Sequence, residues 1–184
     1  MEVKGTAVKP TMEFVKNKFP EKYDEWFNSL PEKSKSILSS HVNATFWYPA
    51  KDAYLIPTQS VCEMFYDDIF NAAFKLGEYS AENSLKGVYK VFIRITTPKF
   101  LLSRGLNMFS SYFKPSNVKL EIKNKSLFHF YIYQFSKEDE IIMHRISGWM
   151  SKALDLINRK NIIMKVEQFK ENSETVFKII CSWD

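Results

Sequence analysis

The spacing of apolar residues changes near residue 115, and this change divides the chain into two parts. Before it, apolar side chains recur every three or four residues, which places them on one face of a helix. After it, apolar and polar residues alternate, as they do along a strand with one buried face. We therefore expect a single α+β domain over residues 1–184, with a helical part over 1–115 and a sheet-rich part over 116–184.

The helical part is punctuated by residues that start or stop helices. Thr11 is a candidate N-cap, Pro20 suits a first turn, and Pro57 should end or kink the helix that begins near Ala50. A Thr97–Pro98 pair suits the start of the last helix, whereas residues 41–50 should form a loop or a short extended segment. The expected helices cover residues 11–19, 20–30, 31–40 and 97–113, and residues 50–95 are expected to be strongly helical but interrupted.

The second part predicts an antiparallel strand–strand–helix–strand–strand module with its helix packed on one face of the sheet. The helix follows from the stripe Ile142, Ile146, Trp149 and Met150. The first hairpin turns at 124–125 and leads into the aromatic strand 127–135. Both faces of this strand are apolar, so it should be covered on both sides or contact a partner.

Small residues interrupt the apolar pattern of the helix expected over residues 76–95. Gly77, Ala81 and Ser84 share one face there, so either another helix approaches closely or a hollow is left between this helix and the sheet. Aromatic rings with a polar tip suit the lining of such a hollow. The candidate lining residues are Trp47, Tyr48, Tyr79, Tyr89, Tyr112, Tyr131 and Tyr133.

Composition and charge narrow the classes of protein. The 184 residues include 16% aromatic residues, which can bury enough surface to fold. The formal net charge of +5 is spread among interleaved acids, so no nucleic-acid partner is expected. Two cysteines indicate a reducing, cytoplasmic location. The chain begins without a signal-peptide pattern and has no apolar run of membrane-spanning length, so we expect a soluble protein.

The residues give little support for an enzyme. The histidines His41, His129 and His144 lie far apart and lack zinc-type spacing, so no metal site is expected. We expect His129 to be a hydrogen-bonded structural residue and His144 to be exposed. No nucleophile elbow or phosphate-binding glycine loop is present, and Cys62 and Cys181 fit small core positions. The acidic pair at 67–68 fits the boundary between two helices.

Several short motifs resemble an uncharacterised bacterial family best represented in myxobacterial genomes. They are VKGTAV at the start, FVKNKFPEKYDEWFNSLP, FWYP at 46–49, and LGEYSAENSLKGVYKVF followed by TPKFLL. The order of elements is also similar, more remotely, to haem-nitric oxide/oxygen-binding (H-NOX) domains, to 4-vinyl reductase-type domains and to TRAPP subunits. This resemblance implies a ligand held between the helices and the sheet.

The chain departs from the haem-binding pattern that the resemblance implies. H-NOX domains carry an axial histidine on the helix that corresponds to residues 98–113, and this stretch contains none. Their Tyr-x-Ser-x-Arg motif would fall on residues 131–135, where only Tyr131 matches. We interpret Met108 as a core residue and expect no haem and no other cofactor. The cysteine cluster of some 4-vinyl reductase-type domains is also missing.

Two functions from different classes remain open, with a third beside them. The first is a non-enzymatic sensory or small-molecule-binding domain that holds an apolar or aromatic ligand without haem. Its expected ligand-binding residues are Trp47, Tyr48, Tyr79, Tyr112, Tyr131 and Tyr133. The second is a TRAPP-like interaction adaptor with a filled core, which uses a dimer face that includes Tyr23, Trp26 and Phe27. The third is acyl-chain carriage on Cys62. A protein partner or a homodimer is expected in either of the first two cases.

Overall fold

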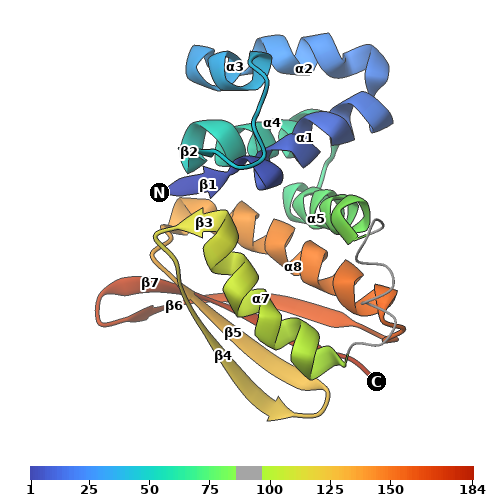
Figure 1. Ribbon diagram of the computed structural model, residues 1–184, viewed down its shortest axis with the longest axis vertical. Helices are drawn as coiled ribbons and strands as arrows, with labels where there is room; N and C mark the ends of the chain where they lie inside the picture. The colour runs from blue at the N-terminus through green and yellow to red at the C-terminus, as the bar shows by residue number, and fades with distance from the viewer. Residues whose placement is uncertain (86–96) are drawn as a thin grey trace.

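The fold is taken from a computed structural model that describes residues 1–85 and 97–184. Helices from the first part of the chain stack on one side of helix α8, and an antiparallel sheet lies on the other side (Figure 1). Helix α7 crosses the same face of the sheet beside α8. The buried apolar residues of both parts join in one connected core. The predicted α+β class is therefore confirmed.

The helical part follows the predicted pattern with shifted boundaries. Helix α1 begins at Gly5, so Thr11 is a buried position inside the helix and not its N-cap. Pro20 opens a 3₁₀ turn before α2, as its fixed backbone angle favours. Pro57 lies where a π-helical segment gives way to α4. The segments are α1 (Gly5–Lys18), a 3₁₀ turn (Pro20–Lys22), α2 (Tyr23–Ser29), α3 (Glu32–Ser39), the π-helix (Lys51–Leu55), α4 (Ile56–Phe65), α5 (Ile69–Leu85) and α7 (Pro98–Tyr112).

Side chains cap two of these helices. The Asp68 carboxylate accepts hydrogen bonds from the backbone N–H groups of Phe70 and Asn71 at 3.1 and 3.0 Å, at the start of α5. The Thr97 hydroxyl accepts one from the N–H of Phe100 at the start of α7. Both agree with the sequence interpretation of these positions, and each satisfies an N–H group that the helix leaves unpaired. The predicted continuation of the α5 pattern over 86–95 lies outside the described residues.

A small antiparallel sheet joins three distant segments of the helical part. Strand β1 (Glu2–Lys4) lies between β2 (Trp47–Pro49) and β3 (Phe113–Lys114), and Val3 pairs with both Tyr48 and Phe113. Strands of two or three residues are too short to show alternation, which is why the sequence did not predict this sheet. It fixes the start of α1 beside the end of α7.

The second part has the predicted antiparallel module, and its strand order is β4-β5-β7-β6 among the described residues. The strands are β4 (Asn117–Asn124), β5 (Leu127–Tyr133), β6 (Ile163–Glu171) and β7 (Glu174–Ser182), and α8 is Glu140–Leu156. In the register, Met164 pairs with Cys181 and Val166 with Ile179, which places apolar residues opposite one another on β6 and β7. Phe128, Phe130 and Ile132 form the buried side of β5.

Phe135 departs from the expected alternation along the aromatic strand. Gln134 has a left-handed backbone conformation with φ of 68°, so strand β5 ends before Phe135. Phe135 then turns into the core, where its ring packs against Phe113 and Phe109 at centroid distances of 5.7 and 6.0 Å. The sequence pattern had placed Phe135 on the same face as Tyr131 and Tyr133.

Polar side-chain groups make hydrogen bonds on the outer face of β5 and its neighbouring strands. Tyr131 donates a hydrogen bond to Glu121 at 2.9 Å, and Lys178 on the neighbouring strand donates one to Glu167 at 3.3 Å. Leu127, His129, Tyr131 and Tyr133 are half-buried there. Neighbouring side chains of the sheet therefore cover much of this apolar face within the chain itself.

Candidate functional site: a pocket between helices and sheet

A pocket of about 120 Å³ lies where the helices of the first part meet α7, α8 and the sheet. Its floor comes from β4 and β5, and its walls come from α1, α5, α7 and α8. Most of the lining is apolar, which favours an apolar ligand. The lining residues are Thr6, Ala7, Pro10, Tyr54, Gly77, Ser80, Ser84, Leu101, Leu102, Gly105, Met108, Phe109, Tyr112, Phe113, Val118, Phe130, Ile132, Arg145, Ile146, Trp149, Met150 and Ala153.

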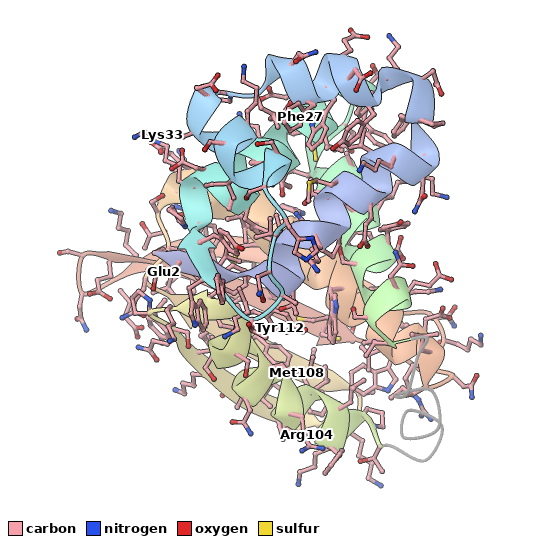
Figure 2. The ribbon with its side chains drawn as sticks, turned by 45° about the horizontal axis from the view of Figure 1, so that its top comes forward. Glu2, Phe27, Lys33, Arg104, Met108 and Tyr112 are labelled. Atoms are coloured by element: carbon pink, nitrogen blue, oxygen red, sulfur yellow. The ribbon has the colours of Figure 1, made fainter. Side chains whose placement is uncertain are left out.

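Helix α7 presents a continuous stripe to the pocket. Leu101, Gly105, Met108 and Tyr112 recur at spacings of four, three and four, which places them on one face. Figure 2 shows Met108 and Tyr112 one turn apart on this helix, at its border with the N-terminal helices. A Cβ added to Gly105, in the middle of the stripe, would meet no atom within 4 Å. The missing side chain of Gly105 therefore leaves space in the pocket.

The small residues of α5 serve both purposes that the sequence left open. A Cβ on Gly77 would lie 1.9 Å from the carbonyl oxygen of Arg145, so this glycine allows α5 and α8 to pack backbone to backbone. Gly148 on α8 does the same against the carbonyl oxygen of Phe74. Further along the same face, Ser80 and Ser84 line the pocket. Close packing at one turn is therefore followed by a hollow at the next.

One charged side chain, Arg145, reaches the pocket from α8 and is only 2% exposed. Its Nη1 donates to the hydroxyls of Thr11 and Thr58 at 2.9 and 2.5 Å. Its Nη2 makes two long contacts, with the Ala7 carbonyl oxygen at 3.5 Å and the Ser80 hydroxyl at 3.4 Å. Its Nε is buried without a hydrogen-bond partner among the described residues.

The described surroundings of Arg145 supply no full negative charge. No carboxylate within residues 1–85 and 97–184 forms an ion pair with it. The Tyr54 ring lies beneath the guanidinium, with 4.2 Å from Cζ to the ring centroid. Burial lowers the pKa of Arg145 from its ordinary value of 12.5, and burial raises the pKa of Tyr54. A guanidinium remains charged at neutral pH, so the pocket wall contains a cation held by neutral groups.

Sequence reasoning missed Arg145, although its position carried a signal. Residue 145 lies three positions after Ile142 and four before Trp149, so it falls on the apolar stripe of its helix. A cation at such a position must either be buried or bend away to solvent. Its partners, Thr11 and Thr58, come from other helices, and the sequence alone gives no reason to place them together.

The structure places one of the six predicted ligand-binding residues, Tyr112, at the pocket. The ammonium groups of Lys4 and Lys114 lie 4.5 and 4.2 Å from the centroid of the Trp47 ring, and the Tyr48 hydroxyl accepts a hydrogen bond from the N–H of Asn43. Neither belongs to the pocket lining. These two residues are part of strand β2, which pairs with β1 at the edge of the small sheet.

The remaining three predicted residues also lie outside the pocket lining. The Tyr79 hydroxyl accepts a hydrogen bond from Asn17 at 2.6 Å, and its ring packs edge-on against Phe14. Tyr131 and Tyr133 lie on the outer face of β5, opposite to the pocket, because strand residues alternate between faces. Tyr89 lies outside the described residues. A ligand-binding role for these residues stays a prediction, with no support from their position relative to this pocket.

Ligands for a metal are sparse in the lining. None of the described lining residues is a histidine or a cysteine, and no group of three His, Cys, Asp or Glu side chains within the described residues could hold a metal ion. The thioether of Met108 borders the pocket. The phenol of Tyr54 also does so, but its raised pKa keeps it protonated and therefore a poor metal ligand.

The histidines and cysteines lie elsewhere. The His129 Nδ1 is 3.8 Å from a Glu121 oxygen and has no hydrogen-bond partner in the described part of the chain, contrary to the expected hydrogen-bonded role. His144 stacks on Phe70 at 4.4 Å and is half-buried, so the prediction that it is exposed was wrong. Cys62 and Cys181 are buried core residues, as predicted, and burial raises the pKa of each thiol to about 12.

Two further sequence expectations concern surfaces. Trp26 is fully buried, so it belongs to the core and not to the aromatic surface proposed for its helix, whereas Tyr23 and Phe27 are half-buried. No helix in the described part of the chain is long and apolar enough to cross a membrane.

The comparisons with known proteins identify similar structures only. No protein-family model matches the sequence, and no curated protein matches it. The fold is similar to solved H-NOX structures. The Fe(II) unliganded H-NOX protein from K. algicida has 15% sequence identity and a TM-score of 0.72, with 98% of this chain and 96% of that chain covered. A mutant of the T. tengcongensis H-NOX has 12% identity and a TM-score of 0.65, with coverage of 98% and 97%.

At such low identities, the likeness concerns the fold. The resemblance to a myxobacterial family, to 4-vinyl reductase-type domains and to TRAPP subunits stays a prediction. The agreement extends over nearly the whole length of the chain and includes both the helical part and the sheet. The protein therefore has an H-NOX-like fold, with a pocket between its helices and its sheet.

Proposed function

We propose that this protein is a non-enzymatic sensory domain that binds a small, mainly apolar organic molecule without haem. The observation that carries the proposal is the apolar pocket between helices and sheet, which remains open at Gly105. An engineered apolar cavity of about 150 Å³ binds benzene, so a space of about 120 Å³ suits a body of one small ring. The H-NOX-like fold supports a role in ligand binding.

The pocket residues do not fit a haem. One of the solved structures with this fold comes from a study of haem distortion in the H-NOX family. In this chain, the described lining offers neither histidine nor cysteine to an iron. The lining donors are the weak thioether of Met108 and phenol groups, of which Tyr54 has a pKa raised by burial. We therefore assign no role to haem.

The pocket also bears on the two rival functions. An adaptor with a filled core does not agree with a pocket that Gly105 leaves open. Acyl-chain carriage on Cys62 is disfavoured because the thiol is fully buried and its pKa is raised to about 12. In the sensory role, a bound ligand would act on a separate partner protein by favouring one of two conformations of the surface.

Two measurements on the purified protein test this proposal. Native mass spectrometry is expected to show a small organic molecule that the folded protein retains. Collisional activation of the protein ions in the gas phase should release this molecule. Titration with haemin, followed by absorbance, is expected to give no saturable Soret band. A sharp Soret band at one haem per chain would contradict the proposal, as would native spectra that show only the bare chain both as purified and after incubation with toluene.

A further inference from the structure

The guanidinium of Arg145 has two unequal edges, and the partners of the less satisfied edge line the pocket. Nη1 donates to Thr11 and Thr58, neither of which lines the pocket. Within residues 1–85 and 97–184, Nη2 has only its long contacts with Ala7 and Ser80, and both of these residues do line the pocket. The free Nε lies on the same edge as Nη2, because these two nitrogens flank the side of the guanidinium away from Cδ.

This edge matches the shape of a carboxylate. The N–H groups of Nε and Nη2 point in parallel, and a carboxylate accepts both with its two oxygens in a side-on pair. Such hydrogen bonds are about 2.7–2.9 Å long in proteins, whereas the present Nη2 contacts are 3.4 and 3.5 Å. A carboxylate at this edge would thus replace two weak contacts and satisfy the one buried donor of Arg145 that has no partner among the described residues.

The electrostatic balance points the same way. A buried charge is costly unless it is paired, and none of the described ion pairs includes Arg145. The hydroxyls and the Tyr54 ring stabilise the cation but leave its net charge in place. An anion that enters the pocket would neutralise this charge in a medium that screens it weakly. The rest of the lining is apolar, so the anion must be attached to an apolar body.

We infer that the ligand of this pocket is a small organic carboxylate, with its carboxylate on the Nε–Nη2 edge of Arg145 and its apolar body against α7 and the sheet. The inference rests on the proposed function and adds the chemical class of the ligand. Ser80 would border the carboxylate, while Gly105 and Met108 would border the body. The size of the pocket favours a single aromatic ring or a short branched chain.

The test compares two probes of the same shape, benzoate and benzamide, by isothermal titration at neutral pH. The wild-type protein is expected to bind benzoate at least about ten-fold more tightly than benzamide, because one charge-assisted pair is worth at least that factor. Arg145→Met should remove this preference and leave benzamide binding within about two-fold. Arg104→Met is the matched control: it removes the same charge from an exposed residue of α7 that does not line the pocket.

The outcomes distinguish a failure of the carboxylate inference from a failure of the proposed function. Equal binding of both probes by the wild-type protein would overturn the carboxylate inference and leave the proposed pocket intact. A benzoate preference that persists in Arg145→Met would also overturn it. Binding of neither probe would overturn the inference together with the proposed function. If Arg145→Met does not fold, Arg145→Lys decides the matter, because it keeps the charge without the side-on edge: the preference must fall several-fold, and an unchanged preference overturns the inference.

Discussion

At the scale of single residues, small side chains and one cation determine the centre of this molecule. Gly77 and Gly148 bring α5 and α8 into backbone contact, and Gly105 leaves space beside them. The sequence showed that small residues gather in α5, but it could not show which of them meet a backbone and which face a hollow. That difference depends on the path of α8, which lies about seventy residues further along the chain.

The first prediction contrasts two glycines with opposite surroundings. Gly77→Ala should destabilise the protein by about 1–3 kcal/mol, because its Cβ would lie 1.9 Å from the Arg145 carbonyl oxygen and force α5 away from α8. Gly105→Ala is the control, since its Cβ meets nothing, and it should stabilise the helix by about 0.5–1 kcal/mol. Urea unfolding measures both changes. Equal effects of the two substitutions would refute this account of the α5–α8 contact.

The second prediction concerns the thiols of Cys62 and Cys181. Burial raises each pKa from 9.0 to about 12, so both should resist a maleimide in the folded protein at pH 8 and react in urea. The unfolded chain loses these protons first, so it binds fewer protons than the native state between pH 9 and 12. Stability should therefore fall as the pH rises through this range, by up to about 1.4 kcal/mol per pH unit for each thiol.

The control for the thiols is the double variant Cys62→Ala/Cys181→Ala. It should be less stable at pH 8 because it leaves space in the core, but its stability should decline less steeply between pH 9 and 12. Rapid labelling of either cysteine in the native wild-type protein would show that the thiol is accessible and that this assignment is wrong.

At the scale of elements, the sequence predicted those helices and strands in which regular apolar spacing continues over many residues or a capping residue is present. Helix α8 and the antiparallel strand–strand–helix–strand–strand order are as the hydrophobic pattern predicted, and Thr97 caps α7. The errors concern short or irregular features. The start of α1 at Gly5 and strands β1, β2 and β3 depend on pairing between distant segments, for which a run of two or three residues gives no pattern.

The third prediction tests the cap of α5. Asp68→Ala should reduce the free energy of unfolding by about 1 kcal/mol, because it removes the acceptor for the N–H groups of Phe70 and Asn71. Asp67→Ala is a close control: the residue is also exposed and acidic at the start of the helix, but it does not bond these N–H groups. Chemical denaturation should show a clear loss only for Asp68→Ala, and equal losses would mean that charge near the helix dipole matters more than capping.

At the scale of the whole molecule, the pocket exists because side chains of the helical part and of the sheet-rich part do not fill the space between them. The sequence predicted the α+β class and left open whether a hollow lies between helices and sheet; the structure has this class and a pocket there. The six ligand-binding residues expected from the sequence stay a prediction, and the polar tips of Tyr48, Tyr79 and Tyr131 bond elsewhere. Aromatic rings with a polar tip suit many kinds of pocket, whereas this pocket is defined by contacts between elements that lie far apart in the sequence.

The most direct test of the central claim is a titration with toluene followed by amide NMR shifts. The wild-type protein should show saturable shifts for α7 around Gly105 and for β4 and β5 around Val118 and Ile132, which line opposite sides of the pocket. Gly105→Leu, which fills the space, should abolish these shifts, while Gly105→Ala should retain them. An absence of saturable shifts, or shifts that persist in Gly105→Leu, would show that the space between helices and sheet does not bind a ligand.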